Sequence, residues 1–121
     1  MKIAISGYNE LRCLHLTLCE AKFHAEPDRK EIQGSSFVAD TANKVFDMLI
    51  EEAPSDKVAE DWKSHRVLQP NSMILPAIRT RCDEWFRANS LTREEKIEFI
   101  KDVAAPYSLT DPLISVILGD P

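Results

Sequence analysis

The clearest hydrophobic pattern in the chain runs from Ser36 to Ala53. Apolar residues recur there at spacings of three and four, which places them on one face of a helix, while most of the charged residues fall on the other side. Ser36 stands where an N-cap hydroxyl would accept from the first free amides. The apolar positions are Val38, Ala42, Val45, Phe46, Leu49, Ile50 and Ala53. The pattern therefore predicts a central helix whose wide apolar face must be covered by other helices.

Five further stretches show helical periodicity, separated by prolines and capping residues. Ser6 is expected to cap the first helix, Thr92 and Glu95 have the spacing of a capping box, and Asp111 before Pro112 is expected to cap the last helix. The charged segment 26–35 is predicted to be the longest loop. The six helices are predicted near 7–24, 37–53, 56–68, 73–88, 93–104 and 112–118. We expect an all-α fold: a single domain over 1–121, with five or six short helices around one core and a short extended arm at residues 1–5.

Composition is typical of a globular protein. Of 121 residues, 44% are hydrophobic and 29% are charged, which is unlike a disordered chain. No apolar stretch approaches the roughly 18 residues of a membrane helix, and none follows Lys2 as a secretory signal would require. The three cysteines form an odd set without CxxC spacing, so we interpret all three as reduced, buried thiols. These features predict a cytosolic protein without membrane contact.

Charge is distributed unevenly along the chain. The formal net charge is −5, yet residues 62–93 carry six basic and two acidic side chains, so the acidic excess lies elsewhere. An acidic surface on a small helical domain suits fast, electrostatically steered docking onto a basic partner. The predicted partner-binding residues are Asp47, Glu51 and Glu52 at the end of the central helix, with Glu94, Glu95 and Glu98 as a second patch.

The favoured function is therefore that of a non-enzymatic binding module, without cofactor or metal, that docks onto or inhibits a macromolecular partner. Toxin-immunity proteins and phage-encoded inhibitors share this profile, although only as an analogy of composition. Because the same chain carries acidic and basic regions, self-association is a further expectation that stays open.

A nucleic-acid-binding regulator is the alternative. The helices predicted at 56–68 and 73–88, with a Pro-Asn-Ser break between them, imitate a helix-turn-helix, and Arg79, Arg81 and Arg87 lie on the second helix. Against this, Asp83 is four residues from both Arg79 and Arg87 and can pair with them. Arg81 is four residues from Trp85, on which it can stack. The acidic remainder of the chain would also repel phosphates.

The first predicted helix holds a third alternative. It carries Cys13, His15, Cys19, Glu20 and His24. His15 and Cys19 are four apart and share a face, the spacing of paired zinc ligands or of a cysteine nucleophile and its base. However, His15 and His24 are nine apart and fall on opposite faces, so a metal site would need ligands from another helix. We therefore favour a structural role, with buried thiols and surface histidines.

Overall fold

The computed structural model describes residues 4–5, 7–24 and 29–120, and within these ranges the chain forms seven helices. They are α1 (Tyr8–Phe23), α2 (Glu31–Gly34), α3 (Ser36–Glu51), α4 (Asp56–His65), α5 (Leu75–Ala88), α6 (Arg93–Ala104) and α7 (Asp111–Leu118). The predicted all-α class is confirmed. The expected number of five or six helices is too low by α2, which lies in the segment predicted to be a loop. With four residues, α2 is too short to produce a periodic pattern.

Two of the predicted helix caps lie one residue away from the observed ones. Ser35, not Ser36, caps α3, and its hydroxyl accepts from the Val38 amide at 3.3 Å. The reason is that Ser35 is the extended residue between α2 and α3, so Ser36 already belongs to the helix. Likewise Thr110 precedes α7, and Asp111 lies in its first turn. A carboxylate there faces the positive end of the helix dipole.

The capping box at the start of α6 is confirmed. The Thr92 hydroxyl accepts from the Glu95 amide at 3.2 Å, and the Glu95 carboxylate accepts from the Thr92 amide at 3.1 Å. Together these bonds satisfy two backbone donors that a helix start would leave free. The predicted cap at Ser6 and residues 1–3 of the predicted arm lie outside the described residues.

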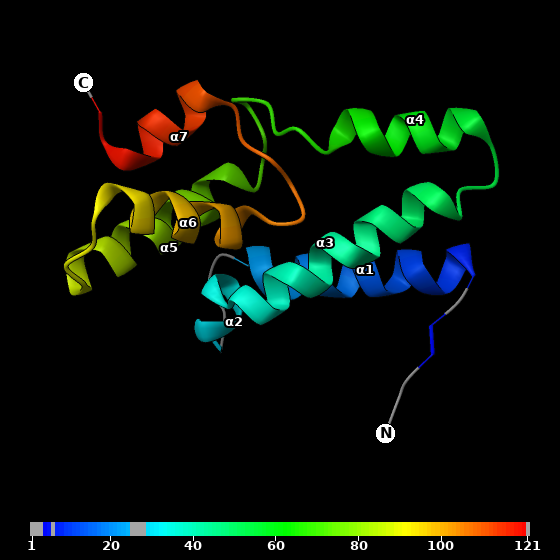
Figure 1. Ribbon diagram of the computed structural model, residues 1–121, viewed down its shortest axis with the longest axis horizontal. Coiled ribbons are helices and arrows are strands. Elements are labelled where there is room, and N and C mark those ends of the chain that lie inside the picture. Colours follow the sequence, from blue (N-terminus) through cyan, green and yellow to red (C-terminus); the bar gives the residue numbers. More distant parts are fainter. Residues whose placement is uncertain (1–3, 6, 25–28, 121) are drawn as a thin grey trace.

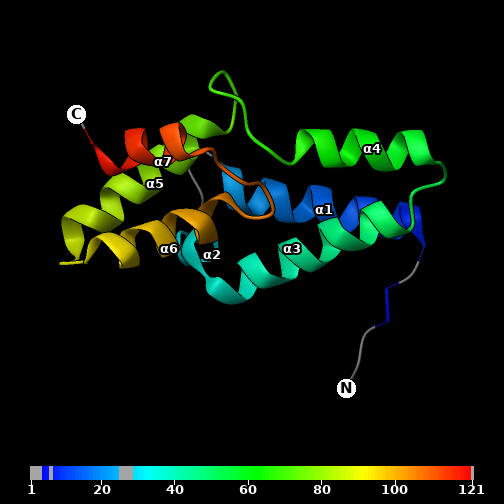
Figure 2. The same cartoon turned by 45° about the horizontal axis from the view of Figure 1, so that its top comes forward.

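The helices form two groups (Figure 1). We call α1, α3 and α4 the N-terminal group and α5, α6 and α7 the C-terminal group; the two lie at opposite ends of the molecule in both Figure 1 and Figure 2. The predicted central position of the Ser36 to Ala53 helix is borne out, because α3 contacts α1, α2, α4 and α6. None of the described helices is long and apolar enough to cross a membrane.

Within the described part of the chain, buried apolar side chains gather in two clusters rather than around the one core that the sequence predicts. The larger cluster belongs mainly to the C-terminal group and consists of Leu68, Leu75, Ile78, Cys82, Ile100, Val103, Ala104, Leu113 and Ile117. The smaller cluster joins α1 to α3 through Leu11, Val45 and Leu49. α4 is described over its whole length and contributes no buried residue; its apolar side chains Val58, Ala59 and Trp62 are only half-buried.

Aromatic rings fill the junction between the two groups. The buried His15 ring meets Phe46, Trp62 and Tyr107 edge-on, with ring centroids 5.5, 5.3 and 6.2 Å away. Tyr107 reaches this position from the segment after α6. That segment pairs with the one after α4, since the Ser108 amide donates to the Arg66 carbonyl at 2.9 Å. The segments after α4 and after α6, far apart in the sequence, are thereby joined by backbone hydrogen bonding next to Tyr107.

Candidate functional site

The turn between α3 and α4 carries a concentration of exposed carboxylates. We call Glu51, Glu52, Asp56 and Glu60 the acidic corner; all four are exposed, and they occupy the end of α3 and the start of α4. Ser55 orders the turn by capping α4, because its hydroxyl accepts from the Val58 amide at 3.2 Å. Two of the six predicted partner-binding residues, Glu51 and Glu52, are therefore held on a fixed backbone at the outer end of the N-terminal group.

The carboxylates at the end of α3 lie at the wrong end of a helix dipole. Glu51 is the last residue of α3 and Glu52 is its C-cap, and α3, described over its whole length, has no basic residue in its last turn. By contrast, α1, α4 and α6 each have an acid in the first turn and a base in the last. A negative charge at a helix C-terminus is unfavourable by about 0.3–1 kcal/mol. Among the described residues, no cation pairs with Glu51 or Glu52 to offset this cost.

Asp47, the third predicted residue of this patch, is already engaged within the chain. Its carboxylate accepts from the Arg66 guanidinium, which lies 4.6 Å above the Phe46 ring centroid. Arg66 also donates through Nε to the Pro106 carbonyl at 3.0 Å. Asp47 therefore helps to fix an arginine that covers the aromatic junction.

The second predicted patch lies far from the first. Glu94, Glu95 and Glu98 are on the first half of α6, and the start of α6 and the end of α3 lie at opposite ends of the molecule in both views (Figures 1 and 2). The Glu95 carboxylate is used in the capping box, whereas Glu94 and Glu98 are exposed. The six predicted acidic residues thus form two separate groups and not one surface.

The three arginines of α5 differ in their availability. Arg79 and Arg87 are exposed, but the Arg81 side chain is only 12% exposed and pairs with Glu84. The expected partner of Arg81, Trp85, instead stacks its ring on Phe99, with centroids 5.2 Å apart and an interplanar angle of 11°. In the nucleic-acid alternative, α5 would be the second helix of a helix-turn-helix. It presents two exposed arginines rather than three.

Cys19 and His15 do come together, as their spacing suggests. The Cys19 sulfur lies 3.7 and 3.8 Å from the two His15 ring nitrogens and 3.8 Å from the Tyr107 hydroxyl. Burial raises the pKa of the Cys19 thiol, opposed by Tyr107 and Lys22, and burial lowers the pKa of His15. Both shifts favour a neutral thiol beside a neutral imidazole. A cysteine nucleophile needs the opposite, a thiolate stabilised by a protonated base.

Two expectations about this helix are wrong. His15 is buried rather than on the surface, because three aromatic rings surround it. Cys13 is exposed rather than buried, whereas His24 is exposed as expected. No group of three or more histidine, cysteine or carboxylate side chains within the described residues is arranged to hold a metal ion.

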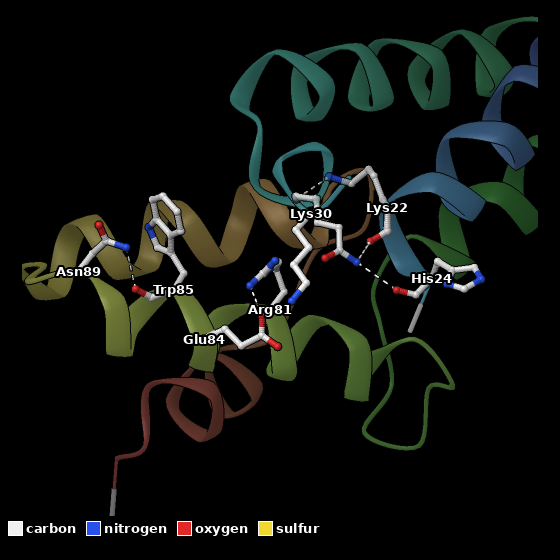
Figure 3. A network of polar contacts seen from close by, with 8 residues as sticks. Lys22, His24, Lys30, Arg81, Glu84, Trp85 and Asn89 are labelled. Atoms are coloured by element: carbon white, nitrogen blue, oxygen red, sulfur yellow. Dashed lines mark hydrogen bonds and ion pairs between the residues drawn. The ribbon is translucent and has the colours of Figure 1, made fainter. Parts of the chain in front are cut away.

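The sequence reasoning missed Lys22, whose side chain is fully buried. Its ammonium donates to the Asp102 carbonyl at 2.7 Å and to the Gln33 carbonyl at 3.5 Å. The Gln33 side-chain amide returns a bond of 2.8 Å to the Lys22 carbonyl and one of 3.2 Å to the His24 carbonyl (Figure 3). We call Lys22 and Gln33 the polar lock, since they join α1, α2 and α6. Burial lowers the pKa of Lys22 to about 8, although Asp102 opposes that change.

A signal for Lys22 was present in the spacing. Leu11, His15, Leu18 and Lys22 follow one another at intervals of four, three and four, so Lys22 continues the buried stripe of α1. A charged residue in such a stripe is normally assigned to the surface. Only the carbonyl groups supplied by α2 and α6 make its burial acceptable.

The comparisons with known proteins add no assignment: the chain matches no protein-family model, no curated protein and no solved structure.

Proposed function

We propose that the protein is a binding module that docks through its acidic corner onto a basic surface of another macromolecule, and acts by occupying that surface as an inhibitor would. The observation that carries the proposal is the placement of Glu51 and Glu52. They are exposed, unpaired among the described residues and at the end of α3 where the helix dipole disfavours them. Local conflicts of this kind concentrate at functional positions.

A basic partner would relieve this conflict. Its lysines or arginines would supply the positive charge that the last turn of α3 lacks, and the rigid turn capped by Ser55 would present the carboxylates without further ordering. Complementary charge also steers diffusional encounter, so the association rate should fall as salt rises. Asp47 lies one turn before Glu51 but is held by Arg66, so we assign it a smaller part.

We also propose that the protein acts by binding rather than catalysis, and in the cytosol. The neutral state favoured for Cys19 and His15 supports the first point. The three cysteines, all free thiols in the described chain, support the second, because such thiols persist in a reducing compartment.

The test uses two variants with the same change in net charge. Glu51→Lys/Glu52→Lys alters the acidic corner, and Glu94→Lys/Glu98→Lys alters the exposed acids of α6 at the other end. Each protein is used to retain binders from lysate of the source cell, with and without nuclease treatment and at low and high salt, and the binders are identified by mass spectrometry. We expect a protein that is retained at low salt by the wild type and by the α6 variant, but not by the corner variant. The affinity of this partner should be lower for the corner variant than for the wild type by about tenfold or more.

Two results would contradict the proposal. One is equal retention by the corner variant and the wild type, which would place docking elsewhere. The other is a binder that disappears after nuclease treatment, which would favour nucleic acid and the exposed Arg79 and Arg87. Light scattering on the purified protein tests for self-association. If the basic partner is a second copy of the chain, the wild type should form a salt-sensitive dimer and the corner variant should not.

A further inference from the structure

A cavity of 310 Å³ lies between α2, α5 and α6, well away from the acidic corner. It is lined by Lys30, Glu31, Gly34, Arg81, Trp85 and Phe99. A larger hollow of 530 Å³ lies beside the start of α5, but none of the described residues that line it is aromatic. Arg79 and Asp83 also bring opposite charges to that hollow. The smaller cavity combines aromatic rings with an excess of positive charge, and this combination suggests a specific ligand.

Its aromatic wall is built by close packing across three helices. Trp85 and Phe99 stack nearly parallel, and Phe99 packs directly on Gly34. A Cβ at Gly34 would lie 2.5 Å from Phe99 Cε2, so only glycine allows α2 to approach the ring this closely. Trp85 nevertheless remains 43% exposed. The wall therefore offers ring surface that the protein itself does not cover.

The charges around the cavity do not balance. One carboxylate, that of Glu84, serves both Lys30 at 3.6 Å and the Arg81 guanidinium. Figure 3 shows Lys30, the residue before α2, extending toward Arg81 and Glu84 on α5, with Trp85 further along α5. The other nearby carboxylate, Glu31, pairs with Arg29 at 3.2 Å. In addition, the buried Nε of Arg81 has no hydrogen-bond acceptor among the described residues. Two cations thus share one anion, and the Nε of the Arg81 guanidinium lacks an acceptor among the described residues.

We propose that this cavity binds a small aromatic carboxylate. The ring of the ligand would lie against Trp85 and Phe99. Its carboxylate would accept hydrogen bonds from Arg81 and Lys30 in competition with the Glu84 carboxylate. An arginine beside an aromatic wall is well suited to this task, because the guanidinium binds carboxylates through directed, charge-assisted hydrogen bonds. The volume lies at the small end of the range for ligand sites, about 300–1,000 Å³, which fits one ring system and not a nucleotide.

The test follows binding of phenylacetate to the full-length, ¹⁵N-labelled protein by NMR. The chain has two tryptophans, and a Trp62→Phe variant assigns the remaining indole N–H signal to Trp85 without altering the cavity. We expect phenylacetate to shift the Trp85 indole signal saturably. Neutral 2-phenylethanol and ring-free propionate should each bind more weakly, because each lacks one of the two recognised groups.

Three variants give signed expectations for phenylacetate affinity. Arg81→Gln should weaken it by about tenfold or more, the loss typical of a hydrogen bond to a charged group. Glu84→Gln should strengthen it by about threefold to tenfold, because the competing carboxylate disappears. Arg79→Gln is the matched control: it removes the same charge from an exposed position on the same helix and should leave the affinity unchanged.

Circular dichroism establishes that each variant is folded, and Lys30→Gln, on a largely exposed side chain, replaces Arg81→Gln if that variant fails to fold. The proposal is overturned if phenylacetate gives no saturable shift at Trp85. It is also overturned if 2-phenylethanol binds as tightly as phenylacetate, or if Arg79→Gln weakens binding as much as Arg81→Gln. None of these results bears on the acidic corner, which shares no residue with the cavity.

Discussion

The two helix groups are held together by different physical means. Nine buried residues form one apolar cluster in and beside the C-terminal group: eight come from α5, α6 and α7, and Leu68 comes from the segment before α5. In the N-terminal group, the corresponding cluster has three members, α3 also buries Ala39, Ala42 and Phe46, and α4 adds no buried residue over its described length. Between the groups lie aromatic rings around His15 and the polar lock of Lys22 and Gln33.

This contrast implies different responses to mutation and to pH. Apolar burial contributes stability in proportion to the area removed from water and is nearly independent of pH. A buried ammonium depends on its acceptors and on its protonation state, so it links stability to pH. We therefore expect the C-terminal group to be the last region to open, α4 to open first, and the junction between the groups to carry the pH sensitivity.

The largest expected effect is on the apolar cluster of the C-terminal group. Ile100→Ala should lower the free energy of unfolding by about 2–5 kcal/mol, because Ile100 is fully buried and its loss leaves a cavity. Val58→Ala on α4 removes half-buried methyl groups and should cost about 1 kcal/mol or less. Urea unfolding followed by circular dichroism measures both values. Equal losses would show that the two groups do not differ in the way the structure indicates.

Hydrogen exchange gives an independent measure of the same difference. The amides of α4 should exchange fastest among the helices of eight or more residues, and those around Ile78 and Ile100 slowest. Protection of α4 equal to that of α6 would mean that the half-buried side chains of α4 hold it more firmly than their exposure suggests.

Lys22→Met should change how stability depends on pH. Burial lowers the pKa of folded Lys22 to about 8 from the ordinary value of 10.5. The unfolded state therefore binds more protons between these values, and the wild type should gain stability as pH rises through them. Below pH 8 the cost of the buried charge is present in full. From pH 7 to 9.5 the wild type should gain about 1–2 kcal/mol relative to Lys22→Met, which lacks the titrating group.

Chemical unfolding at a series of pH values measures this difference, and Lys44→Met on the exposed face of α3 is the matched control. Burial also raises the pKa of Cys82, to about 12, and that of Tyr107, which by itself lowers stability at alkaline pH. Both groups are present in all three proteins, so they cancel in the comparison. Parallel pH curves for the wild type and Lys22→Met would contradict the assignment of the pH dependence to the polar lock.

The smallest expected effect concerns the acidic corner, where substitution should not lower the free energy of unfolding as it does in the apolar cluster. Glu51→Lys/Glu52→Lys should leave the free energy of unfolding unchanged or raise it by up to about 1 kcal/mol, because lysine suits the negative end of α3. Glu94→Lys/Glu98→Lys should lower it by about 0.5–1 kcal/mol, because Glu94 lies in the first turn of α6. Thermal unfolding at low salt compares the two. A large loss in the corner variant would indicate that Glu51 and Glu52 serve the fold.

Much of the fold follows from local patterns. The amphipathic spacing of Ala42, Val45 and Leu49 and the capping box of Thr92 and Glu95 act within a few residues of sequence, so they can be recognised without knowing the rest of the molecule. Trp85 shows where such patterns fail. It follows the buried Ile78 and Cys82 along the apolar face of α5, yet it remains 43% exposed beside Phe99. Its burial depends on what α2 and α6 place next to it.

The candidate site shows the same division. Glu51 and Glu52 could be selected from the sequence because charge and helix position are local properties. Local properties do not predict that Arg66 holds Asp47. Nor do they predict that Glu94 and Glu98 lie at the far end of the molecule. The cavity of Trp85, Phe99, Arg81 and Lys30 gave no sequence signal, because its walls come from three helices separated along the chain.

The sequence by itself determined the all-α class, most helix boundaries to within one residue and the acidic character of the end of α3, since each depends on residues a few positions apart. The tertiary structure alone decided that the apolar residues form two clusters and that His15 and Lys22 are buried. It also decided that two cations share Glu84 beside an aromatic wall. The physical reason is that burial and pairing depend on which groups approach from elsewhere in the chain. For Lys22 these groups are the backbone carbonyls of Gln33 and Asp102, 11 and 80 residues away in sequence.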